Sequence, residues 1–465
     1  MASLETQRLV RFLRSRGALV HEDLELFARS PCGTRGVFAI APIRHGELLI
    51  RLPRGAVLSA CDGEDWMPEH ARSASPLLRA ALCLLREQSL GAASSWAPYL
   101  ETLPDEYDTL ENWTQAELRA LSGTSVYEEL RGLRDAASGD LVGPARLLWE
   151  RSIAPIVAQR PDLWPDASVE TFLRACAAVR TRGFYDTAPG GGGPYMLPAI
   201  DMLNHSCKGT ATSLVVERDE TDLVFSMEAE RDIEAGEELT HMYDHLDDAQ
   251  LLLTFGFVSS AGEGALPTTA RLSLQAIIDA TDGVARRCDL GWDIRDGWAR
   301  KVEACTKLLA AHGGKVGVSS EEPLPDELLT AVLLLLLPRA DFEGLLQGEE
   351  SIESSAAFPR VPLLDRTLLR GEPELATAAV QAIHHLVRTT LRRYPDDQSL
   401  QPESSSTCNR RLQMAAVLRR AEQKALLKTQ EEAVELLAIA QAEDSDASDT
   451  QEDEEKKNPR KIQRS

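Results

Sequence analysis

Two polar segments about thirty residues apart carry the side chains best suited to bind and orient a small molecule. In Asp201–Ser206 an Asn-His pair follows an apolar run, and in Gly236–Asp244 a tyrosine, Tyr243, ends an alternating stretch. A phenol has a pKa near ~10, so at neutral pH it stays protonated and offers a polar contact instead of a base. Each motif alone also fits an ordinary turn or a satisfied core side chain.

The elements that would position these segments follow from the hydrophobic pattern. Residues 1 to about 58 alternate short β-branched runs with glycine turns, which predicts a small sheet. From about 61 to 180 the apolar residues recur at helical spacing, so this stretch is expected to be a helical insert. Strand signals return over Pro194–Phe257, after the flexible run Gly190–Gly193, which is expected to be a surface loop.

The order of these elements resembles that of SET-domain protein methyltransferases. Gly33–Ala39, followed by Ile43–Pro53, is similar to the first SET strands, and Arg182-Gly183-Phe184 resembles the family's Arg-Ala-Phe element. Leu251–Phe257 resembles the closing Leu-Leu-x-x-Tyr-Gly-Phe motif, and the long insertion before Arg182 is typical of the branch that contains Rubisco large-subunit methyltransferase. The resemblance implies an α+β fold: a SET β-fold with a pseudoknot and a helical insertion, followed by an all-α C-terminal domain.

The resemblance also implies a domain plan. Residues 1–258 would form the SET domain with its insert at about 61–180, and residues 266–440 a helical substrate-binding domain. The C-terminal signature of that domain is matched by Arg392–Pro395 and by Asn409–Lys424. On that last helix the apolar spacing predicts a buried face made by Leu412, Ala416, Leu418 and Leu426. The acidic and basic tail, 441–465, cannot bury enough apolar surface to offset its ordering entropy and is expected to be disordered.

The implied cofactor is S-adenosyl-L-methionine. By resemblance, the glycine-rich turn contacts its methionyl part through the backbone, Arg182 meets its carboxylate, and Asn204 with His205 contacts the adenine. The implied catalytic residue is Tyr243, which also lines the substrate channel with Phe255. The full set of implied cofactor contacts is Gly33, Thr34, Arg35, Arg182, Asn204, His205 and Tyr243. The arginines could instead be surface residues, and His205 a satisfied core histidine.

The implied reaction is a single in-line displacement of a methyl group from a sulfonium to an amine. It requires an uncharged nucleophile and good alignment, so positioning dominates. A lysine that enters an apolar channel beside a sulfonium is desolvated next to a positive charge, and both effects lower its pKa. No dedicated base is then essential.

One position departs from the family pattern and keeps alternatives open. The residue before Gly256-Phe257 is usually Tyr and here is Phe255. The lost hydroxyl could change how many methyl groups are added, or could signal a histidine acceptor. Three functions remain: a protein-lysine N-methyltransferase acting on a non-histone protein, a protein-histidine N-methyltransferase, and a catalytically weak interaction module. Retention of Tyr243, Asn204, His205 and Arg182 favours an enzyme.

Composition limits the partners. The chain has 465 residues, 43% of them hydrophobic, which is consistent with two globular domains. Its net charge of -23 argues against a nucleic-acid surface and favours a protein substrate whose target lysine lies in a basic segment. The apolar run Leu328–Leu337 is about half the ~20 residues that a membrane-spanning helix needs, so it is expected to be a buried core helix. We expect a monomer.

The cysteine spacing and the two ends of the chain indicate whether a metal site is expected and in which compartment the protein acts. The eight cysteines show no Cys-x-Cys or Cys-x-x-Cys spacing, so no zinc or other metal site is expected, and isolated cysteines suit a reducing compartment. The basic amphipathic segment between Leu4 and Arg16 could be a transit peptide, but a structural helix is the preferred interpretation. The expected location is cytoplasmic, nuclear or both, with the basic end of the tail as a candidate import signal.

Overall fold

The computed structural model describes residues 3–30, 33–63, 65–131, 133, 141, 143–189, 191–207, 210–218, 223–259, 266–287, 290, 292–347, 363–364, 366–395 and 406–441. The chain divides into two compact units. The first comprises residues 1–120, 126–266 and 401–417, and the second comprises 121–125, 267–400 and 418–465. The expected disordered tail, 441–465, lies outside the described residues except for Gln441.

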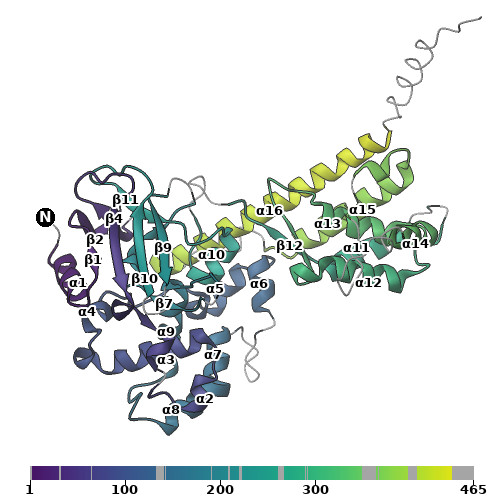
Figure 1. Cartoon of the computed structure of the whole chain (residues 1–465). Helices are drawn as coiled ribbons and strands as arrows, with labels where there is room; N and C mark the ends of the chain where they lie inside the picture. Colours follow the sequence, from purple (N-terminus) through teal and green to yellow (C-terminus); the bar gives the residue numbers. More distant parts are fainter. Residues whose placement is uncertain are drawn as a thin grey trace, which may run out of the picture. The chain divides into compact units, whose positions relative to one another are not determined.

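The first unit is built on an eight-stranded sheet with the order β1-β4-β10-β9-β11-β3-β2, in which β8 pairs with β11 (Figure 1). Its strands are β1 Leu19–Val20, β2 Leu24–Arg29, β3 Arg35–Ala39, β4 Leu48–Pro53, β8 Asn204–His205, β9 Thr212–Arg218, β10 Leu223–Ala229 and β11 Glu238–His241. A second sheet has the order β5-β7-β6, with β5 Leu58–Ser59, β7 Tyr195–Met196 and β6 Gly183–Phe184.

Strand β11 joins segments that lie far apart in the sequence. It pairs antiparallel with β3, where Leu239 faces Val37. It also pairs parallel with β8, so that His241 faces His205, and it meets the start of β9. The two polar segments that drew attention in the sequence are therefore neighbouring strands, and the chain emerging from β11 leads directly into Tyr243.

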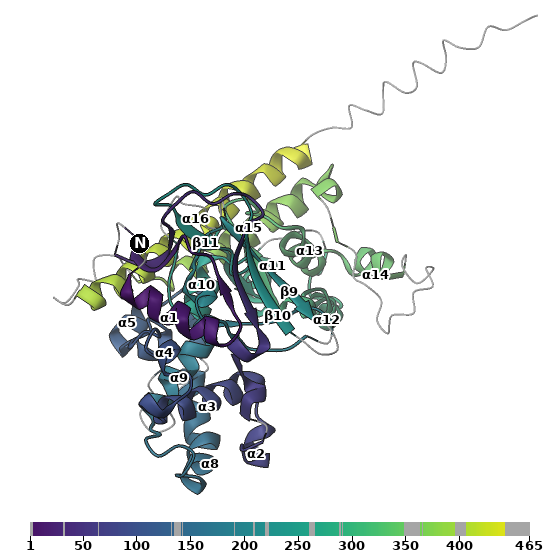
Figure 2. The same ribbon diagram turned by 60° about the vertical axis from the view of Figure 1, so that its left-hand side comes forward.

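Helices complete the first unit. They are α1 Leu4–Ser15, α2 Glu69–Arg72, α3 Pro76–Ser89, α4 Ala97–Leu100, α5 Gln115–Ala120, α6 Ser125–Leu130, α7 Pro144–Leu148, α8 Ala154–Gln159, α9 Val169–Arg182 and α10 Asp248–Phe255. Figures 1 and 2 both place α2, α3, α8 and α9 together at the end of the unit that is remote from β11. Helix α9 begins with a capping box at Ser168 and packs its apolar face against α3. It ends at Arg182, which delivers that side chain to the sheet.

The second unit is mainly helical, with α11 Leu274–Ala285, α12 Trp298–Leu309, α13 Asp326–Leu336, α14 Arg339–Gln347 and α15 Pro373–Leu391. Helix α13 contacts α11, α12 and α15, and every residue from Leu328 to Leu336 is buried, which confirms the expected core helix. Within the described residues, no helix has both the length and the apolar character needed to cross a bilayer. The unit also contains a two-stranded ladder, β12 Ala270–Ser273 with β13 Lys315–Val318, which the helical pattern did not predict.

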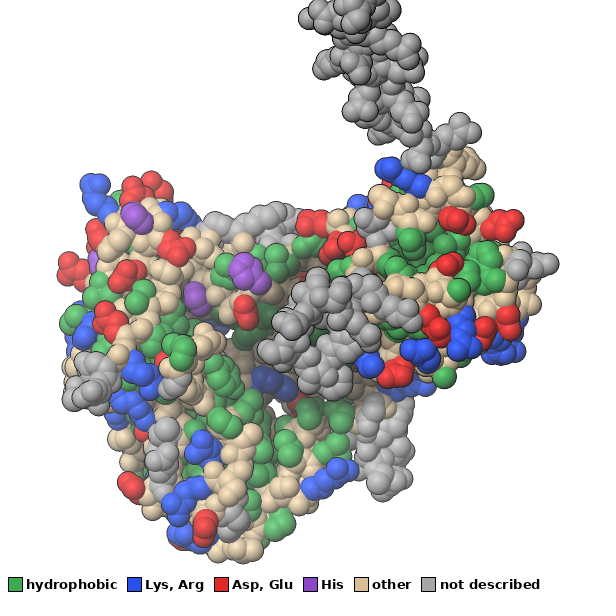
Figure 3. Space-filling view, turned by 45° about the vertical axis from the view of Figure 1, so that its right-hand side comes forward, with side chains coloured by type: hydrophobic (Ala, Val, Ile, Leu, Met, Phe, Trp, Pro, Cys, Tyr) green, Lys and Arg blue, Asp and Glu red, His purple; other side chains and the backbone are tan. Residues whose placement is uncertain are grey.

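The long helix α16, Ser406–Gln441, contributes to both units. Its first part belongs to the first unit, where the buried Arg411 donates to Asp108 Oδ1 at 3.1 Å and to the Asn112 carbonyl at 2.7 Å. The expected ranges, 1–258 and 266–440, therefore differ from the observed division, in which residues 401–417 return to the first unit. On the face shown in Figure 3, acidic and basic side chains are interspersed over the described surface.

Candidate active site

Tyr243 donates two hydrogen bonds to residues of the other polar segment. Its hydroxyl donates to the Leu203 carbonyl oxygen at 2.7 Å, and its backbone N–H donates to His205 Nδ1 at 3.1 Å. Burial raises the pKa of Tyr243 to about 12, so the phenol stays protonated. The side chain can therefore orient a ligand, but it is unsuited to act as a base at neutral pH.

The tautomer of His205 follows from these contacts. Because Nδ1 accepts from Tyr243, the ring proton of neutral His205 lies on Nε2, which is 3.0 Å from Cys207 Sγ. Burial lowers the pKa of His205, and the neighbouring His241 lowers it further. A neutral ring is therefore expected at pH 7, with its face 5.1 Å from the Tyr243 ring between centroids.

Asn204 ties the first glycine-rich turn to β11. Its Nδ2 donates to the Arg35 carbonyl at 2.9 Å and to Glu238 Oε1 at 2.6 Å. Gly36 permits this approach, because a Cβ there would lie 2.3 Å from the Glu238 oxygen and 2.9 Å from Asn204 Nδ2. The predicted residues of the turn and of β8 are thus brought together. Glu238, which belongs to the second polar segment but was assigned no role there, connects them.

The rest of the turn presents mainly backbone. Gly33 adopts a φ of +85°, and the Ser30 N–H donates to the Thr34 carbonyl at 2.9 Å. The Arg35 guanidinium points to the insert, where Nη1 donates to the Thr102 carbonyl at 2.8 Å. Burial and the nearby Arg182 lower the pKa of Arg35. Arg35 is accordingly a half-buried structural arginine as well as a turn residue. Any contact of its guanidinium with the cofactor would have to share Nη1 with the Thr102 carbonyl.

Arg182 lies in a buried polar cluster. Its Nη1 donates to the Asp201 carbonyl at 2.7 Å and lies 3.7 Å from Asp201 Oδ2, which accepts a 2.8 Å hydrogen bond from the Tyr99 hydroxyl. Burial opposes the Arg182 charge, but Asp201 and the phenols of Tyr107 and Tyr99 outweigh it and raise its pKa. Burial also raises the pKa of Asp201, against the opposing effect of Arg182.

Several polar atoms of this cluster are buried and have no hydrogen-bond partner among the described residues. They are Arg182 Nε, Asp201 Oδ1 and the Tyr107 hydroxyl. A leftover guanidinium donor, a carboxylate acceptor and a hydroxyl match a ligand that carries both a carboxylate and an ammonium group. The amino-acid end of S-adenosylmethionine has that chemistry, so the residues present fit the predicted cofactor.

Sequence motifs did not reveal the whole cluster. Asp201 lies in the first polar segment, where the Asn-His pair drew attention instead, and its burial was not visible from spacing. Tyr99 and Tyr107 belong to the helical insert, in which no local pattern marks them as site residues. Only the folded arrangement brings them to Arg182.

Aromatic rings enclose the other side of Tyr243. Its ring centroid lies 4.8 Å from that of Phe255 and 6.5 Å from that of Phe257. On the opposite flank, His241 lies 6.2 Å from Tyr243 and 6.1 Å from Phe184. Such an enclosure can desolvate an amine and so favour its uncharged form. The predicted channel residues Tyr243 and Phe255 are in contact.

The described residues contain no group of three or more His, Cys, Asp or Glu side chains that could hold a metal ion. Cys83, Cys176, Cys207 and Cys305 are free thiols. The remaining cysteines, Cys32, Cys61, Cys288 and Cys408, are not among the side chains that the structure describes.

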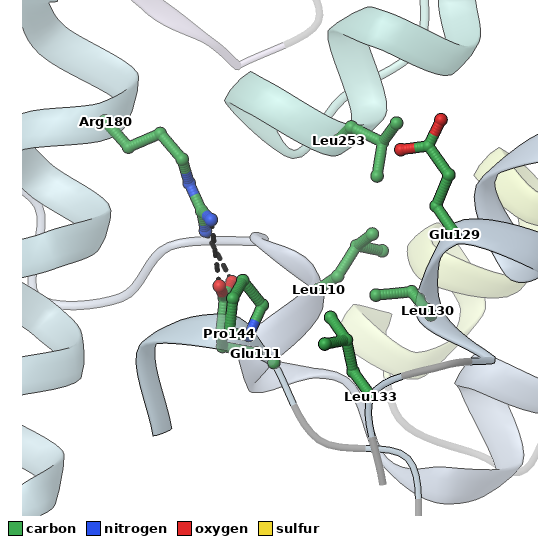
Figure 4. Close-up of a pocket in the computed structure, with 9 residues that line it drawn as sticks. Leu110, Glu111, Glu129, Leu130, Leu133, Pro144, Arg180 and Leu253 are labelled. Carbon is green, nitrogen blue, oxygen red and sulfur yellow. Dashed lines mark hydrogen bonds and ion pairs between the residues drawn. The ribbon is translucent and has the colours of Figure 1, made fainter. Parts of the chain in front are cut away.

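A pocket of about 220 Å³ lies elsewhere in the first unit (Figure 4). Arg180 pairs with Glu111 on one wall, with Nη1 donating to Oε1 at 2.8 Å, and Leu110, Leu130, Leu133 and Leu253 converge on the other. None of the predicted site residues lines it. Its walls come from the insert and α10, so it is a separate feature from the Arg182 cluster.

Comparisons with known proteins agree with the fold. A SET-domain family model matches residues 34–244. The chain is 27% identical over 365 residues to N-lysine methyltransferase SETD6 of Mus musculus, covering 72% of each chain. It is 25% identical over 417 residues to setd6 of Danio rerio, covering 81% of this chain and 85% of that protein. The solved structure of Rubisco LSMT bound to AdoMet matches with a TM-score of 0.63 at 18% identity, over 97% of this chain and 100% of that chain. The predicted SET fold with a helical C-terminal region is confirmed.

Proposed function

From the match of residues 34–244 to a SET-domain family model, we propose that the chain is an S-adenosylmethionine-dependent protein-lysine N-methyltransferase acting on a non-histone protein. The proposal rests on two neighbouring features. The buried cluster at Arg182 keeps polar atoms without hydrogen-bond partners among the described residues, and aromatic rings surround Tyr243. One suits a charged amino-acid group and the other an uncharged amine. The relatives named N-lysine methyltransferases support this assignment.

The cofactor-binding residues are Gly33, Thr34, Arg35, Arg182, Asn204, His205 and Tyr243. Arg182 binds the carboxylate of the amino-acid end, and its geometry is kept by the Asp201 carbonyl. Asn204 and His205 form the adenine side, with the backbone of the glycine-rich turn between the two ends. S-adenosylmethionine, when bound, supplies an electrophilic methyl group.

Tyr243 orients the acceptor. Its protonated hydroxyl donates to the Leu203 carbonyl, which fixes the direction of the O–H bond. The hydroxyl oxygen can then make a polar contact with an amine but does not remove a proton from it. The rings of Phe255 and Phe257 exclude water from the same space, which lowers the pKa of an entering lysine. Desolvation and alignment together provide the catalysis.

A histidine acceptor is the second candidate. The observation that favours it is Phe255, which lacks the hydroxyl usual at this position and leaves a less polar enclosure around Tyr243. A neutral imidazole needs no deprotonation and would tolerate that change. The two acceptors differ in the modified residue, which is directly measurable.

The wider assignments concern the substrate. The second unit holds the protein substrate, whose target residue lies in a basic segment, because a chain of net charge -23 attracts basic partners. The enzyme acts as a monomer in the cytoplasm, the nucleus or both, without zinc and without a nucleic-acid or membrane partner.

The test uses the full-length protein with methyl-labelled S-adenosylmethionine and a cell extract. We expect label on a lysine side chain of a discrete protein, identified by mass spectrometry, and no label with Tyr243→Phe. Label on histidine would replace the proposal by its alternative. Cofactor binding without any transfer would instead indicate an interaction module.

A further inference from the structure

The pocket of Figure 4 is a feature of the first unit that the proposed function leaves unused. Four leucine side chains converge on it and make its apolar wall: Leu110, Leu130, Leu133 and Leu253. Its volume of about 220 Å³ is smaller than the roughly 300–1,000 Å³ of pockets that hold drug-sized ligands. A cavity of this size suits a single large aliphatic side chain, the kind of anchor that fills a pocket in a protein–protein contact.

The polar wall is an ion pair that keeps hydrogen-bonding capacity. Arg180 donates from Nη1 to Glu111 Oε1 at 2.8 Å and from Nη2 to Glu111 Oε2. Burial opposes the charge of Glu111, but Arg180 outweighs it and holds the Glu111 pKa below its ordinary value, so the carboxylate stays ionised at neutral pH. Each terminal guanidinium nitrogen carries a second N–H bond, and each carboxylate oxygen has a second lone pair. A neutral amide, with one C=O and one N–H, matches both.

The charge of the pocket selects a neutral or basic ligand. The charges of Arg180 and Glu111 cancel, and the exposed Glu129, which also lines the pocket, adds a carboxylate. A free carboxylic acid would be repelled there. A peptide supplies the matching groups, because an aliphatic side chain stands beside a neutral backbone amide. The net charge of -23 also favours a partner with basic flanking residues.

The pocket shares two helices with the candidate active site. Arg180 precedes Arg182 by two residues on α9, and Leu253 precedes Phe255 by two residues on α10. Positions two apart on a helix lie about 200° apart around its axis, so each helix turns one side to the pocket and the other to the active site. A partner seated in the pocket is therefore held about one helix diameter, ~10 Å, from the site.

We propose that this pocket is a docking site for the protein substrate, in which a leucine-type side chain lies between the four leucines and its adjoining backbone amide bonds to Arg180 and Glu111. The identity of the partner rests on the proposed function, whereas the chemistry of the pocket does not. A lysine side chain is the same at every position of a protein, so selection of one lysine requires a contact that its competitors lack. An anchor bound away from Tyr243 provides that contact.

A binding test without turnover uses the full-length protein with carbon-13 leucine methyl groups. The probe is N-acetyl-leucine N-methylamide, and N-acetyl-glycine N-methylamide is its matched control without a side chain. The leucine probe should shift the methyl resonances of Leu133 and Leu253, assigned by their loss in Leu→Ile variants, and the glycine probe should not. No shift with the leucine probe, or equal shifts with both probes, would overturn the inference.

A transfer test uses the methylated protein and a short peptide around its labelled lysine. Leu133→Trp places an indole in the cavity, and the KM for the intact protein should rise about tenfold or more, the loss of one aliphatic anchor. The kcat/KM on the short peptide and the S-adenosylmethionine affinity should not change. Leu148→Trp is the matched control, because Leu148 is 38% exposed on α7 and does not line the pocket. It should match the wild type on both substrates.

Competition on the wild-type enzyme decides the question if Leu133→Trp does not fold. Saturating N-acetyl-leucine N-methylamide should inhibit transfer to the intact protein and not to the short peptide. Inhibition of neither reaction would overturn the docking role. Equal losses on both substrates in a folded Leu133→Trp would also overturn it, since the pocket would then support folding or catalysis.

Two further outcomes separate this inference from others. Self-association of the wild type that Leu133→Trp abolishes, measured by sedimentation, would make a second copy of the chain the occupant and overturn the inference. Absence of lysine methylation by the wild type would contradict the proposed function and the identity of the partner. The methyl shifts would still decide whether the pocket binds a leucine amide.

Discussion

The second unit and the Arg182–Tyr243 region of the first unit bury polar side chains in different ways. In the second unit, buried Lys301 donates from Nζ to the carbonyls of Ile294 at 2.8 Å and Leu337 at 2.5 Å. Buried Glu422 accepts from the Ser125 and Tyr394 hydroxyls at 2.5 and 2.8 Å. In the first unit, Arg182, Asp201, Tyr107 and His241 each keep a buried polar atom without a partner among the described residues.

This difference distinguishes buried polar groups that stabilise the fold from buried polar groups that can bind a ligand. A buried charge with all its hydrogen bonds made within the protein stabilises a particular packing, and nothing remains for a ligand. Buried atoms left without partners carry a cost that a ligand can remove. In the described part of the second unit, Asp282 Oδ1 has no hydrogen bond but forms an ion pair with Arg295 Nη2 at 2.7 Å. In the first unit Arg79, Thr109 and Arg180 also keep a buried atom without a hydrogen bond to a described residue, so it is the clustering of such atoms near Tyr243 that marks the candidate site.

The largest effect on cofactor binding is expected for Arg182→Ala, which removes a side chain of the buried cluster in the first unit. Removing a charge-assisted contact to the cofactor carboxylate should weaken S-adenosylmethionine binding roughly 30- to 100-fold, or about 2–3 kcal/mol. Arg180→Ala is the matched control, because Arg180 lies two residues before Arg182 on α9 and pairs with Glu111 instead. Calorimetric titration of both variants would show a selective loss. Equal losses would mean that the fold of α9, and not the Arg182 cluster, sets the affinity.

In the second unit, removing a buried charge should lower the stability of the protein and leave its cofactor affinity unchanged. Lys301→Met leaves two buried carbonyls unpaired and should lower the free energy of unfolding by about 2 kcal/mol without changing cofactor affinity. Lys307→Met, an exposed change on the same helix that breaks only an ion pair with Glu303, should leave stability nearly unchanged. Urea titration measures both. An altered cofactor affinity in Lys301→Met would remove the distinction between the two kinds of buried charge.

The smallest effect is expected for a substitution at Phe255, which changes one ring of the aromatic enclosure and leaves the buried polar cluster intact. Phe255→Tyr adds a hydroxyl beside Tyr243 and should redistribute mono-, di- and trimethyl products, since one hydrogen bond of roughly 1 kcal/mol can reorient an amine in a tight channel. Cofactor binding should not change. Mass spectrometry of the modified peptide gives the distribution, and an unaltered pattern would assign Phe255 to packing alone.

Much of the first unit could be predicted because local patterns and the motifs agree there. Alternation in Glu238–His241, the glycine at Gly36 and the Asn-His pair each reflect a backbone requirement that the fold imposes. The confirmed core helix α13 follows from its apolar pattern, whereas the SET fold was implied by the resemblance of the motifs to that family. The implied roles of Tyr243 and Arg182 stay predictions.

What could not be predicted depends on contacts between distant segments. The expected buried face of α16 included Leu412 and Ala416, which are only partly buried, while Arg411 and Glu422 are buried and hydrogen-bonded to polar partners. Hydrophobic periodicity cannot detect a buried charge, because its partners come from elsewhere in the chain. The return of residues 401–417 to the first unit and the role of Tyr99 were missed for the same reason.

The most direct test of the account is Tyr243→Phe, measured for cofactor binding and for methyl transfer on one preparation of the full-length protein. The hydroxyl serves the acceptor while the ring supports the pocket wall, so calorimetry should give nearly wild-type S-adenosylmethionine affinity and the transfer assay should give no lysine methylation. Wild-type transfer rates in this variant would contradict the assignment of Tyr243 and the active site built around it.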